Sequence, residues 1–226
     1  MAEPAQPRIP LSRERILQTA LQLVNEGGLE ALSMRKLAQA LGFEAMSLYN
    51  HVTNKGDVID GILDLVLAET EPPAPDGDWR SAIRQSAISV HSALRRHPWA
   101  AAPLMSADHV RDSRLDYMNT LLERLRTAGF PADTTYHAYH ALDGHIFGFS
   151  MWQAGHAVNV TPENLPTLAR AFAQQHPLDR WPYVLEHFDQ HITEGTLHNI
   201  RAFDFTLDLI LDGLEKLRAN SAAARP

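Results

Sequence analysis

The stretch that decides the fold runs from position 32 to position 52 and reads Leu32-Ser-Met-Arg-Lys-Leu-Ala-Gln-Ala-Leu-Gly-Phe-Glu-Ala-Met-Ser-Leu-Tyr-Asn-His-Val52. Two helices that cross at a steep angle need a small residue where their backbones approach, and Ala38 supplies it. The turn between them needs a residue that tolerates a positive φ, and Gly42 supplies that. Leu48 then provides an apolar side chain that can point back into the first helix. This spacing predicts a helix-turn-helix.

The second predicted helix, at about 44–51, presents short and polar side chains outward, as a helix that enters a DNA major groove does. These side chains are Ala45, Met46, Ser47, Tyr49, Asn50 and His51. Ser33 and Asn54 are expected to cap the neighbouring helices, whose backbone amides suit phosphate contacts. Arg35 and Lys55 lie around the same face. The alternative is an ordinary helical hairpin whose glycine only ends a helix.

Two segments resemble the DNA-binding head of the tetracycline-repressor (TetR) family. They are Glu26-Gly-Gly-Leu-Glu-Ala-Leu-Ser-Met-Arg-Lys-Leu-Ala-Gln-Ala-Leu-Gly42 and Ser47-Leu-Tyr-Asn-His-Val-Thr-Asn-Lys55. The body of the tetracycline repressors is matched more weakly, by Trp79, Gly129-Phe130, Gly148 and Phe205-x-Leu-x-Leu-Ile-x-x-Gly-Leu-Glu215. The resemblance implies a homodimeric one-component repressor. Its N-terminal helix-turn-helix reads a pseudo-palindromic operator, and its C-terminal bundle dimerises and binds an inducer.

The resemblance assigns DNA-contact roles position by position, to Arg35, Ser47, Tyr49, His51 and Lys55. Three positions depart from the tetracycline repressors. Ala45 and Met46 stand where those proteins carry a glutamine and a proline, and Asn50 stands where they carry a tryptophan. Ala45 cannot make a bidentate base contact, whereas Asn50 can pair with adenine. We therefore expect a different operator.

Helical periodicity runs through almost the whole chain, and strand alternation is nearly absent. The pattern predicts an all-α protein with helices at about 13–26, 33–41, 44–51, 54–69, 78–97, 109–128, 132–156, 162–175, 180–192 and 199–218. The segment Glu71-Pro-Pro-Ala-Pro-Asp-Gly-Asp78 cannot be helical and is typical of a linker. We therefore expect a helix-turn-helix domain of three helices within residues 10–70, and a dimerising, ligand-binding helical bundle at 71–226.

The composition excludes several classes of function. The length of 226 residues suits one large domain or two unequal ones. The hydrophobic share of 45% is ordinary for a globular chain with a buried core. The absence of cysteine excludes a disulfide scaffold, thiolate catalysis and cysteine-based metal sites. The net charge is −7, but residues 1–55 are almost balanced, which disfavours nucleic acid along the whole chain and still allows a small DNA-binding head. No segment resembles a signal peptide or a membrane helix, so we expect a cytoplasmic protein.

Two predicted helices of the body, 132–156 and 199–218, are apolar on most sides. A helix of this kind is buried on both faces. In the family these two helices meet those of a second subunit as a four-helix bundle, so the resemblance implies a homodimer. The alternative is that both helices pack within a monomer.

The resemblance also assigns an effector pocket by position. Its residues are Ser86, Val90, Leu104, Met118, Leu121, Tyr136, Tyr139, Asp143 and, from the partner subunit, Trp152. Aromatic rings with few polar groups are typical of small-ligand sites. Because Asp143 is the only formal charge in this set, we expect a neutral or cationic effector with an aromatic or alicyclic body. Leu104 replaces the histidine that holds magnesium in tetracycline repressors, which disfavours magnesium–tetracycline. The alternative is that these side chains simply fill the core.

The sequence implies no metal ion and no cofactor. His187 and His191, like His137, His140 and Asp143, share a helix face, but neither group has a His-Glu-x-x-His string or a clear third ligand. Phosphate-binding glycine loops and nucleophile motifs are absent, so an all-α enzyme is a remote alternative. A nearer alternative keeps the DNA-binding head and lets the body respond to a protein partner. Loss of operator affinity on binding a small molecule distinguishes the two.

Overall fold

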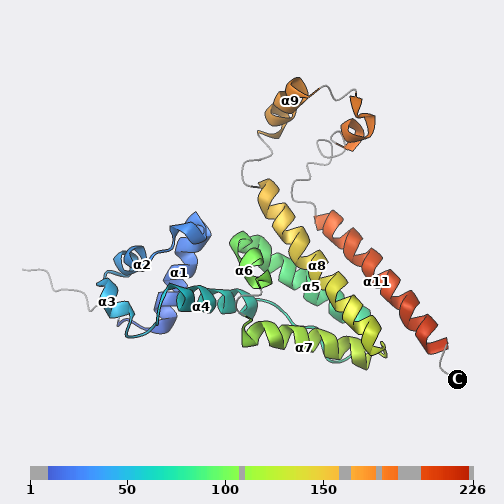
Figure 1. Cartoon of the computed structure of the whole chain (residues 1–226), viewed down its shortest axis with the longest axis horizontal. Helices are drawn as coiled ribbons and strands as arrows, with labels where there is room; N and C mark the ends of the chain where they lie inside the picture. The colour runs from blue at the N-terminus through green and yellow to red at the C-terminus, as the bar shows by residue number, and fades with distance from the viewer. Residues whose placement is uncertain (1–9, 107–109, 158–163, 177–179, 188–199, 224–226) are drawn as a thin grey trace, which may run out of the picture.

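The computed structural model describes residues 10–106, 110–157, 164–176, 180–187 and 200–223. Within these ranges every regular element is a helix, which confirms the predicted all-α class. Figure 1 shows the N-terminal helices gathered at one end of the molecule and two long helices lying beside each other at the other end.

The N-terminal helices form a head in which each helix begins at a defined cap. They are α1 (Arg13–Gly27), α2 (Met34–Leu41), α3 (Ala45–Leu48) and α4 (Lys55–Ala68), with a 3-10 turn η1 (Leu29–Ala31). The side chains of Ser12, Ser33 and Asn54 each accept a hydrogen bond from the backbone N–H three residues later. The caps predicted at Ser33 and Asn54 are therefore confirmed, and Ser12 caps α1 in the same way. The apolar stripe of α1 is buried against α2 and α4, as its periodicity predicts.

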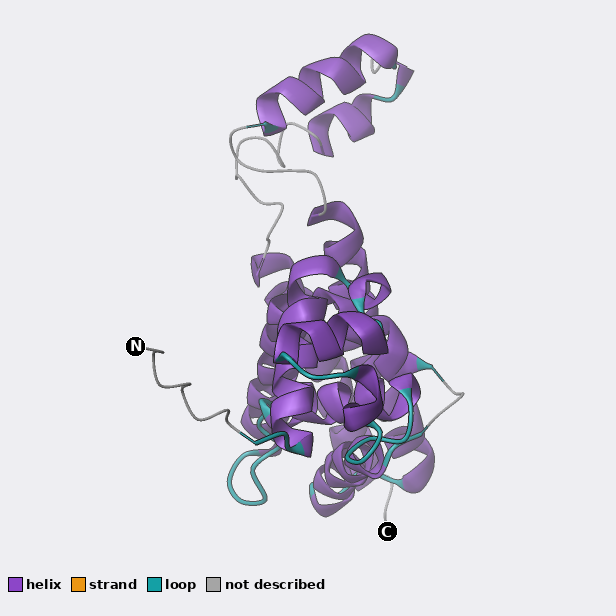
Figure 2. Ribbon diagram, turned by 90° about the vertical axis from the view of Figure 1, so that its left-hand side faces the viewer, coloured by secondary structure: helices purple, strands orange, loops and turns teal. Residues whose placement is uncertain are grey.

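The body is built around α8. Its elements are α5 (Trp79–Arg96), η2 (Pro98–Ala100), α6 (Ala101–Met105), α7 (Asp112–Thr127), α8 (Ala132–Ala157), α9 (Leu165–Gln175) and α11 (Ile200–Ala223), and residues 182–187 are also helical. Helices α5, α6, α7 and α11 all contact α8. Figure 2 shows α9 and residues 182–187 near each other, beyond this central group.

One apolar core passes through the head and the body without interruption. Its buried side chains come from every helix from α1 to α8 and from α11, and include Ile16, Leu48, Ile62, Ile83, Leu125, Phe147 and Phe203. Helix α4 connects the two parts, since it packs on α1 and also contacts α5 and α7. At the beginning of α5, the ring of Trp79 packs edge to face on the ring of Phe130, with the ring centres 4.9 Å apart.

The structure differs from the predicted elements at several places, among them the end of α11, which lies at Ala223 rather than 218. The predicted helix 44–51 is regular only over Ala45–Leu48 and continues as a turn, because the amides of His51 and Val52 both bond to the carbonyl of Leu48. Helix α6 was not predicted, since its five residues include a proline, which a first helical turn tolerates. Helix α7 begins at Asp112 rather than 109, with Arg111 extended before it. Residues 188–192 of the predicted helix 180–192 lie outside the described ranges.

Candidate nucleic-acid interface and effector site

The helix-turn-helix is closed by a tight turn at Gly42. This residue has φ 76° and ψ 29°, in the left-handed region that favours glycine. The amide of Phe43 donates to the carbonyl of Ala38 at 3.0 Å and so completes the turn. Ala38 and Leu48 are both buried, and α2 packs on α3. The three roles predicted from the spacing are therefore confirmed.

An ion pair holds the short α3 in place. Arg13 of α1 donates to both carboxylate oxygens of Asp57 of α4, at 2.6 and 3.1 Å, and to the carbonyl of His51 at 3.3 Å. The amide and hydroxyl of Thr53 donate to the same carboxylate. The hydrogen bond from Arg13 is the main cause that lowers the pKa of Asp57 to about 2. Helix α1 thus fixes the end of α3 and the beginning of α4 as one unit.

The predicted DNA-contacting residues lie on α2, α3, the turn after α3 and the first residue of α4, at one end of the molecule (Figure 1). Six are exposed, namely Arg35, Met46, Tyr49, Asn50, His51 and Lys55, and three are half-buried, namely Ser33, Ala45 and Ser47. Ser33 has a structural role as the cap of α2. Arg35 and Lys55 form no ion pair with any described residue, so their charges are available for phosphates. The DNA roles of the nine residues stay predictions.

Polar contacts join the head to the body where α1, α4 and α5 end. Arg96 donates two hydrogen bonds to Glu69, at 2.7 and 3.0 Å, and Nε2 of His97 lies 3.0 Å from the same carboxylate. The other ring nitrogen of His97 lies 2.8 Å from Oδ1 of Asn25, which also accepts from the indole of Trp99. Burial alone raises the pKa of Glu69, but the hydrogen bonds from Arg96 and His97 lower it overall.

The predicted effector residues fall on the elements that meet at the centre of the body. Six of them are buried, namely Ser86, Val90, Leu104, Leu121, Tyr139 and Asp143, and they come from α5, α6, α7 and α8. Met118 is half-buried beside this core. Tyr136 and Trp152 are 60% and 45% exposed on the surface of α8. The ligand roles of the nine residues stay predictions.

Arg114 of α7 lies directly against this set and was missed by the sequence analysis. Its Nη2 donates to both oxygens of Asp143, at 2.6 and 2.7 Å, and to the hydroxyl of Tyr139 at 3.1 Å. Its guanidinium carbon lies 4.8 Å from the ring centre of Phe147 and 5.2 Å from that of Tyr117. Burial lowers the pKa of Arg114, but Asp143 raises it above its ordinary value, so the cation persists.

This ion pair corrects the expected charge of the site. The preference for a cationic effector rested on Asp143 as the only formal charge among the pocket residues. Arg114 neutralises that charge at hydrogen-bond distance, and both side chains are largely buried. The argument for a cationic effector is therefore wrong, because a pairing between α7 and α8 was not visible in the separate segments. Burial is the main cause that raises the pKa of Tyr139; Asp143 raises it further, while Arg114 opposes this rise.

Polar side chains at the beginning of α7 also form ion pairs and a hydrogen bond with α4. Arg111 forms a short ion pair with Asp60 through Nη1, and its Nε lies 3.5 Å from Asp64. The hydroxyl of Ser113 donates to Asp64 at 2.6 Å. Arg111, Ser113 and Arg114 thus connect α4, which carries the head, to α8 within four residues of chain.

A buried histidine joins α5, α8 and α11. Nδ1 of His91 lies 2.9 Å from the hydroxyl of Ser150, which itself donates to the carbonyl of Ile146. The hydroxyl has one proton, so Nδ1 of His91 must carry the hydrogen of this contact. The ring stacks on Phe203 at 3.9 Å. Burial lowers the pKa of His91 to about 4, which keeps the ring neutral.

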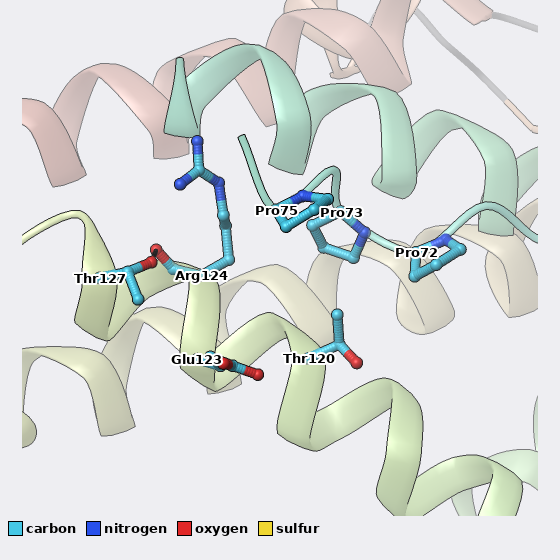
Figure 3. Close-up of a pocket in the computed structure, with 7 residues that line it drawn as sticks. All are labelled: Pro72, Pro73, Pro75, Thr120, Glu123, Arg124 and Thr127. Carbon is cyan, nitrogen blue, oxygen red and sulfur yellow. Dashed lines mark hydrogen bonds between the residues drawn. The ribbon is translucent and has the colours of Figure 1, made fainter. Parts of the chain in front are cut away.

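A surface hollow of about 260 Å³ lies between the proline-rich segment 71–78 and α7 (Figure 3). It is lined by Pro72, Pro73, Pro75, Thr120, Glu123, Arg124 and Thr127. None of the predicted effector residues lines it. Arg124 donates to the carbonyl of Gly77 and so fixes the proline-rich segment on α7. This hollow therefore marks a structural joint rather than the predicted effector site.

Two further findings concern only the part of the chain that is described. No group of three or more His, Asp or Glu side chains there could hold a metal ion, while His191 lies outside that part. None of the helices described is long and apolar enough to cross a membrane.

A helix-turn-helix with a tight glycine turn, joined to a helical body, is typical of DNA-binding regulators. The comparisons with known proteins specify the family. Residues 16–62 match the family model for bacterial regulatory proteins of the tetR family, and residues 71–218 match the tetracyclin repressor-like C-terminal domain. The chain belongs to the TetR family of transcriptional regulators, which is a family of regulators rather than of enzymes.

Individual relatives cover most of the chain. It is 32% identical to the HTH-type transcriptional repressor DrrR1 of Streptomyces coeruleorubidus, over 94% of this chain and 80% of that protein. It is 30% identical to the class D tetracycline repressor protein of Escherichia coli, over 89% and 93%. The crystal structure of ActR of Streptomyces coelicolor in complex with actinorhodin matches with a TM-score of 0.71 and 26% identity, over 91% and 95%.

Proposed function

We propose that this chain binds a pseudo-palindromic operator as a homodimer, represses transcription there, and is released by a small hydrophobic effector. The observation that carries the proposal is the continuity of α4, which begins beside the predicted DNA-contacting residues and ends in the core that holds the predicted effector residues. Such a regulator works in the cytoplasm, where its operator lies.

The operator part rests on the exposed side chains of the head. Asn50 and Ser47 are suited to base edges, and the apolar Met46 is 73% exposed, as a side chain that contacts thymine methyl groups needs to be. Arg35 and Lys55 supply contacts to phosphates. Because α3 is only four residues long, one head reads few base pairs, and useful specificity needs two heads.

The homodimer part rests on apolar side chains that a single chain leaves uncovered. Met151 and Trp152 of α8 and Phe205, Leu209 and Leu217 of α11 are each 45% exposed or more. Helices α8 and α11 contact each other and lie side by side (Figure 1). The exposed apolar side chains of both helices are therefore available to a second subunit. Exposed apolar surface of this extent is typical of a protein interface.

The effector part rests on buried aromatic side chains and on the relatives. Tyr139 and Tyr117 surround the neutral pair of Arg114 and Asp143, which suits a flat, uncharged molecule that carries oxygen atoms. ActR, which is similar to this chain, is found in complex with actinorhodin. We therefore propose an aromatic, oxygen-bearing effector for this chain.

Release needs a difference in affinity between two conformations. An effector lowers operator affinity only if it binds the conformation that fits DNA less well, and a coupling of about 1–3 kcal/mol is usual. Helix α4 is the natural lever, because a tilt of α4 changes the distance between the two heads of a dimer. The contacts of Glu69 with Arg96 and His97 hold the far end of this lever to α5.

The test uses the intergenic DNA next to the gene that encodes this chain. We expect a mobility shift with that DNA, a footprint with two half-sites, and dissociation when actinorhodin or a related polycyclic quinone is added. Tyr49→Ala combined with Lys55→Ala should abolish the shift. Unchanged affinity of this double variant would disprove binding through the helix-turn-helix. Retention of the complex at every effector concentration would favour a protein partner for the body.

A further inference from the structure

One nitrogen of Arg114 is buried without any hydrogen-bond partner. Its Nη2 serves Asp143 and Tyr139, whereas its Nη1 has no partner and no exposed surface. Buried donors are rarely left unpaired, because the loss of hydration costs about 1–3 kcal/mol, and more for a charged group. An unpaired nitrogen of a buried guanidinium therefore calls for a function.

The chemistry of this nitrogen defines what it can bind. A guanidinium only donates, so its partner must offer an acceptor. Asp143 already neutralises the charge, and burying a second anion here would leave one negative charge in excess. The fitting partner is a neutral acceptor oxygen, as in a ketone or quinone. The rings of Tyr117 and Phe147, on which the guanidinium lies, provide flat apolar surface beside it.

We propose that Nη1 of Arg114 binds a carbonyl oxygen of the effector, and that the first turn of α7 passes this event on to α4. The proposal rests on the effector-dependent function proposed above and names the residue and the chemical group involved. Arg114 has no place among the pocket residues assigned by resemblance to the family, so this role adds a specificity-determining residue to that set.

The burial of Nη1 explains how binding can be coupled to movement. A ligand reaches this atom only if the surrounding side chains shift, so it binds a conformation other than the one described here. That difference supplies the unequal affinity for two states that release requires. Arg111 and Ser113, which lie within one helical turn of Arg114, hold Asp60 and Asp64 of α4. A shift of this turn therefore changes the polar contacts that Arg111 and Ser113 make with α4.

The carbonyl contact is tested by a matched pair of probes, 9-fluorenone and fluorene. Both are flat tricyclic molecules, but only fluorenone carries a carbonyl oxygen. Binding to the full chain without DNA is measured by equilibrium dialysis. We expect fluorenone to bind about tenfold or more tightly than fluorene, since hydrogen bonds to charged groups are worth at least that much. Equal affinity of the two probes, or no binding of fluorenone up to its solubility, overturns the proposal.

Arg114→Lys assigns the preference to this side chain. Lysine keeps a charge for Asp143 but lacks the second nitrogen of the fork. We expect the variant to bind both probes equally while its circular dichroism and thermal unfolding stay close to those of the wild type. Arg84→Lys is the matched control, because Arg84 pairs with Asp204 and Asp208 on α11 instead. Retention of the fluorenone preference in Arg114→Lys overturns the proposal.

The coupling of effector binding to α4 through the first turn of α7 is tested by a substitution in α4. Asp64→Asn, which weakens the contact with Ser113, should reduce the ratio of operator dissociation constants with and without fluorenone by threefold or more. An unchanged ratio overturns the role of the α7 turn. The proposed function fails separately, namely if the wild-type chain shifts no DNA at all, because the probe measurements involve no DNA.

Discussion

Gly61 of α4 lies directly against Leu17 of α1, and a Cβ at position 61 would come within 2.5 Å of Cδ2 of Leu17. The absence of a side chain at Gly61 lets the two helices approach closely. Leu17 and Gly61 are both buried in the core. This contact, together with the pair of Arg13 and Asp57, makes α1 and α4 one rigid piece of the head.

Gly61→Val should destabilise the protein by about 1–3 kcal/mol, because the added side chain overpacks the contact with Leu17. Urea unfolding measures this change. Ala68→Val, at an exposed position of the same helix, shows the cost of a β-branched residue in α4 without overpacking and should cost well under 1 kcal/mol; valine is a better helix former than glycine, so helix propensity cannot explain a loss at position 61. The double variant Leu17→Ala, Gly61→Val should lose less free energy of unfolding than the sum of the losses in the two single variants. A loss equal to that sum contradicts the close contact.

Arg35→Ala and Lys55→Ala should each weaken DNA binding by a similar factor for all sequences, because both are expected to contact phosphates. Each should reduce the salt dependence of binding by about one charge. Asn50→Ala should instead change which half-site sequence binds best. Fluorescence anisotropy at several salt concentrations separates the two kinds of effect. Lys216→Ala, at the far end of α11, is the control and should leave the salt slope unchanged.

Leu209→Glu should give a folded monomer, because Leu209 is 55% exposed on α11 and is proposed to face the partner. Leu207→Glu, two residues away, should instead unfold the chain, since Leu207 is completely buried in its own core. A charge buried without a partner costs several kcal/mol. Light scattering and circular dichroism tell the outcomes apart. A wild-type chain that is monomeric at micromolar concentration contradicts the dimer.

Acid should destabilise the protein through His91. Burial lowers its pKa from the ordinary 6.5 to about 4, so the unfolded chain binds a proton that the folded chain refuses. Its contribution to the free energy of unfolding is complete above pH 6.5 and is lost as the pH falls toward 4. His91→Phe should flatten part of this decline, as measured by urea unfolding at several pH values. The remaining slope reflects other groups, including His145, whose pKa is also lowered by burial.

The exposed His137 on α8 provides the control for this measurement. His137→Phe should leave the decline between pH 6.5 and 4 as it is in the wild type. An identical decline in His91→Phe and in the wild type would mean that His91 does not resist protonation in the folded chain.

Much of the fold was predictable because it depends on local signals. The N-caps at Ser33 and Asn54 and the left-handed Gly42 each act within a few residues, and the structure confirms them. The helix stripes are equally local, since a period of 3.6 residues decides which face is buried. The end of α3 was less predictable, because it depends on Arg13 from another helix.

The site was less predictable because it depends on contacts between distant segments. Arg114 and Asp143 are 29 positions apart and come together only when α7 packs on α8. Read alone, Arg114 is one more charge on an amphipathic helix, while Asp143 looks like a single acid among aromatic residues. The same holds for Leu207 and Leu209, which both belong to an apolar stretch, although Leu207 is completely buried and Leu209 is exposed.

The uninterrupted core has a consequence for how the protein melts. Because apolar side chains from α1 to α8 and from α11 form one cluster, the head has no separate core of its own to retain when the body loosens. Heating should therefore give one cooperative transition with equal calorimetric and van't Hoff enthalpies. A molecule that binds deep in the body should also slow proteolysis and amide exchange in α2 and α3, far from where it sits. The isolated N-terminal head should fold poorly without the body. A chimera that carries the head of a relative therefore needs a matching surface on α4, where α4 contacts α5 and α7.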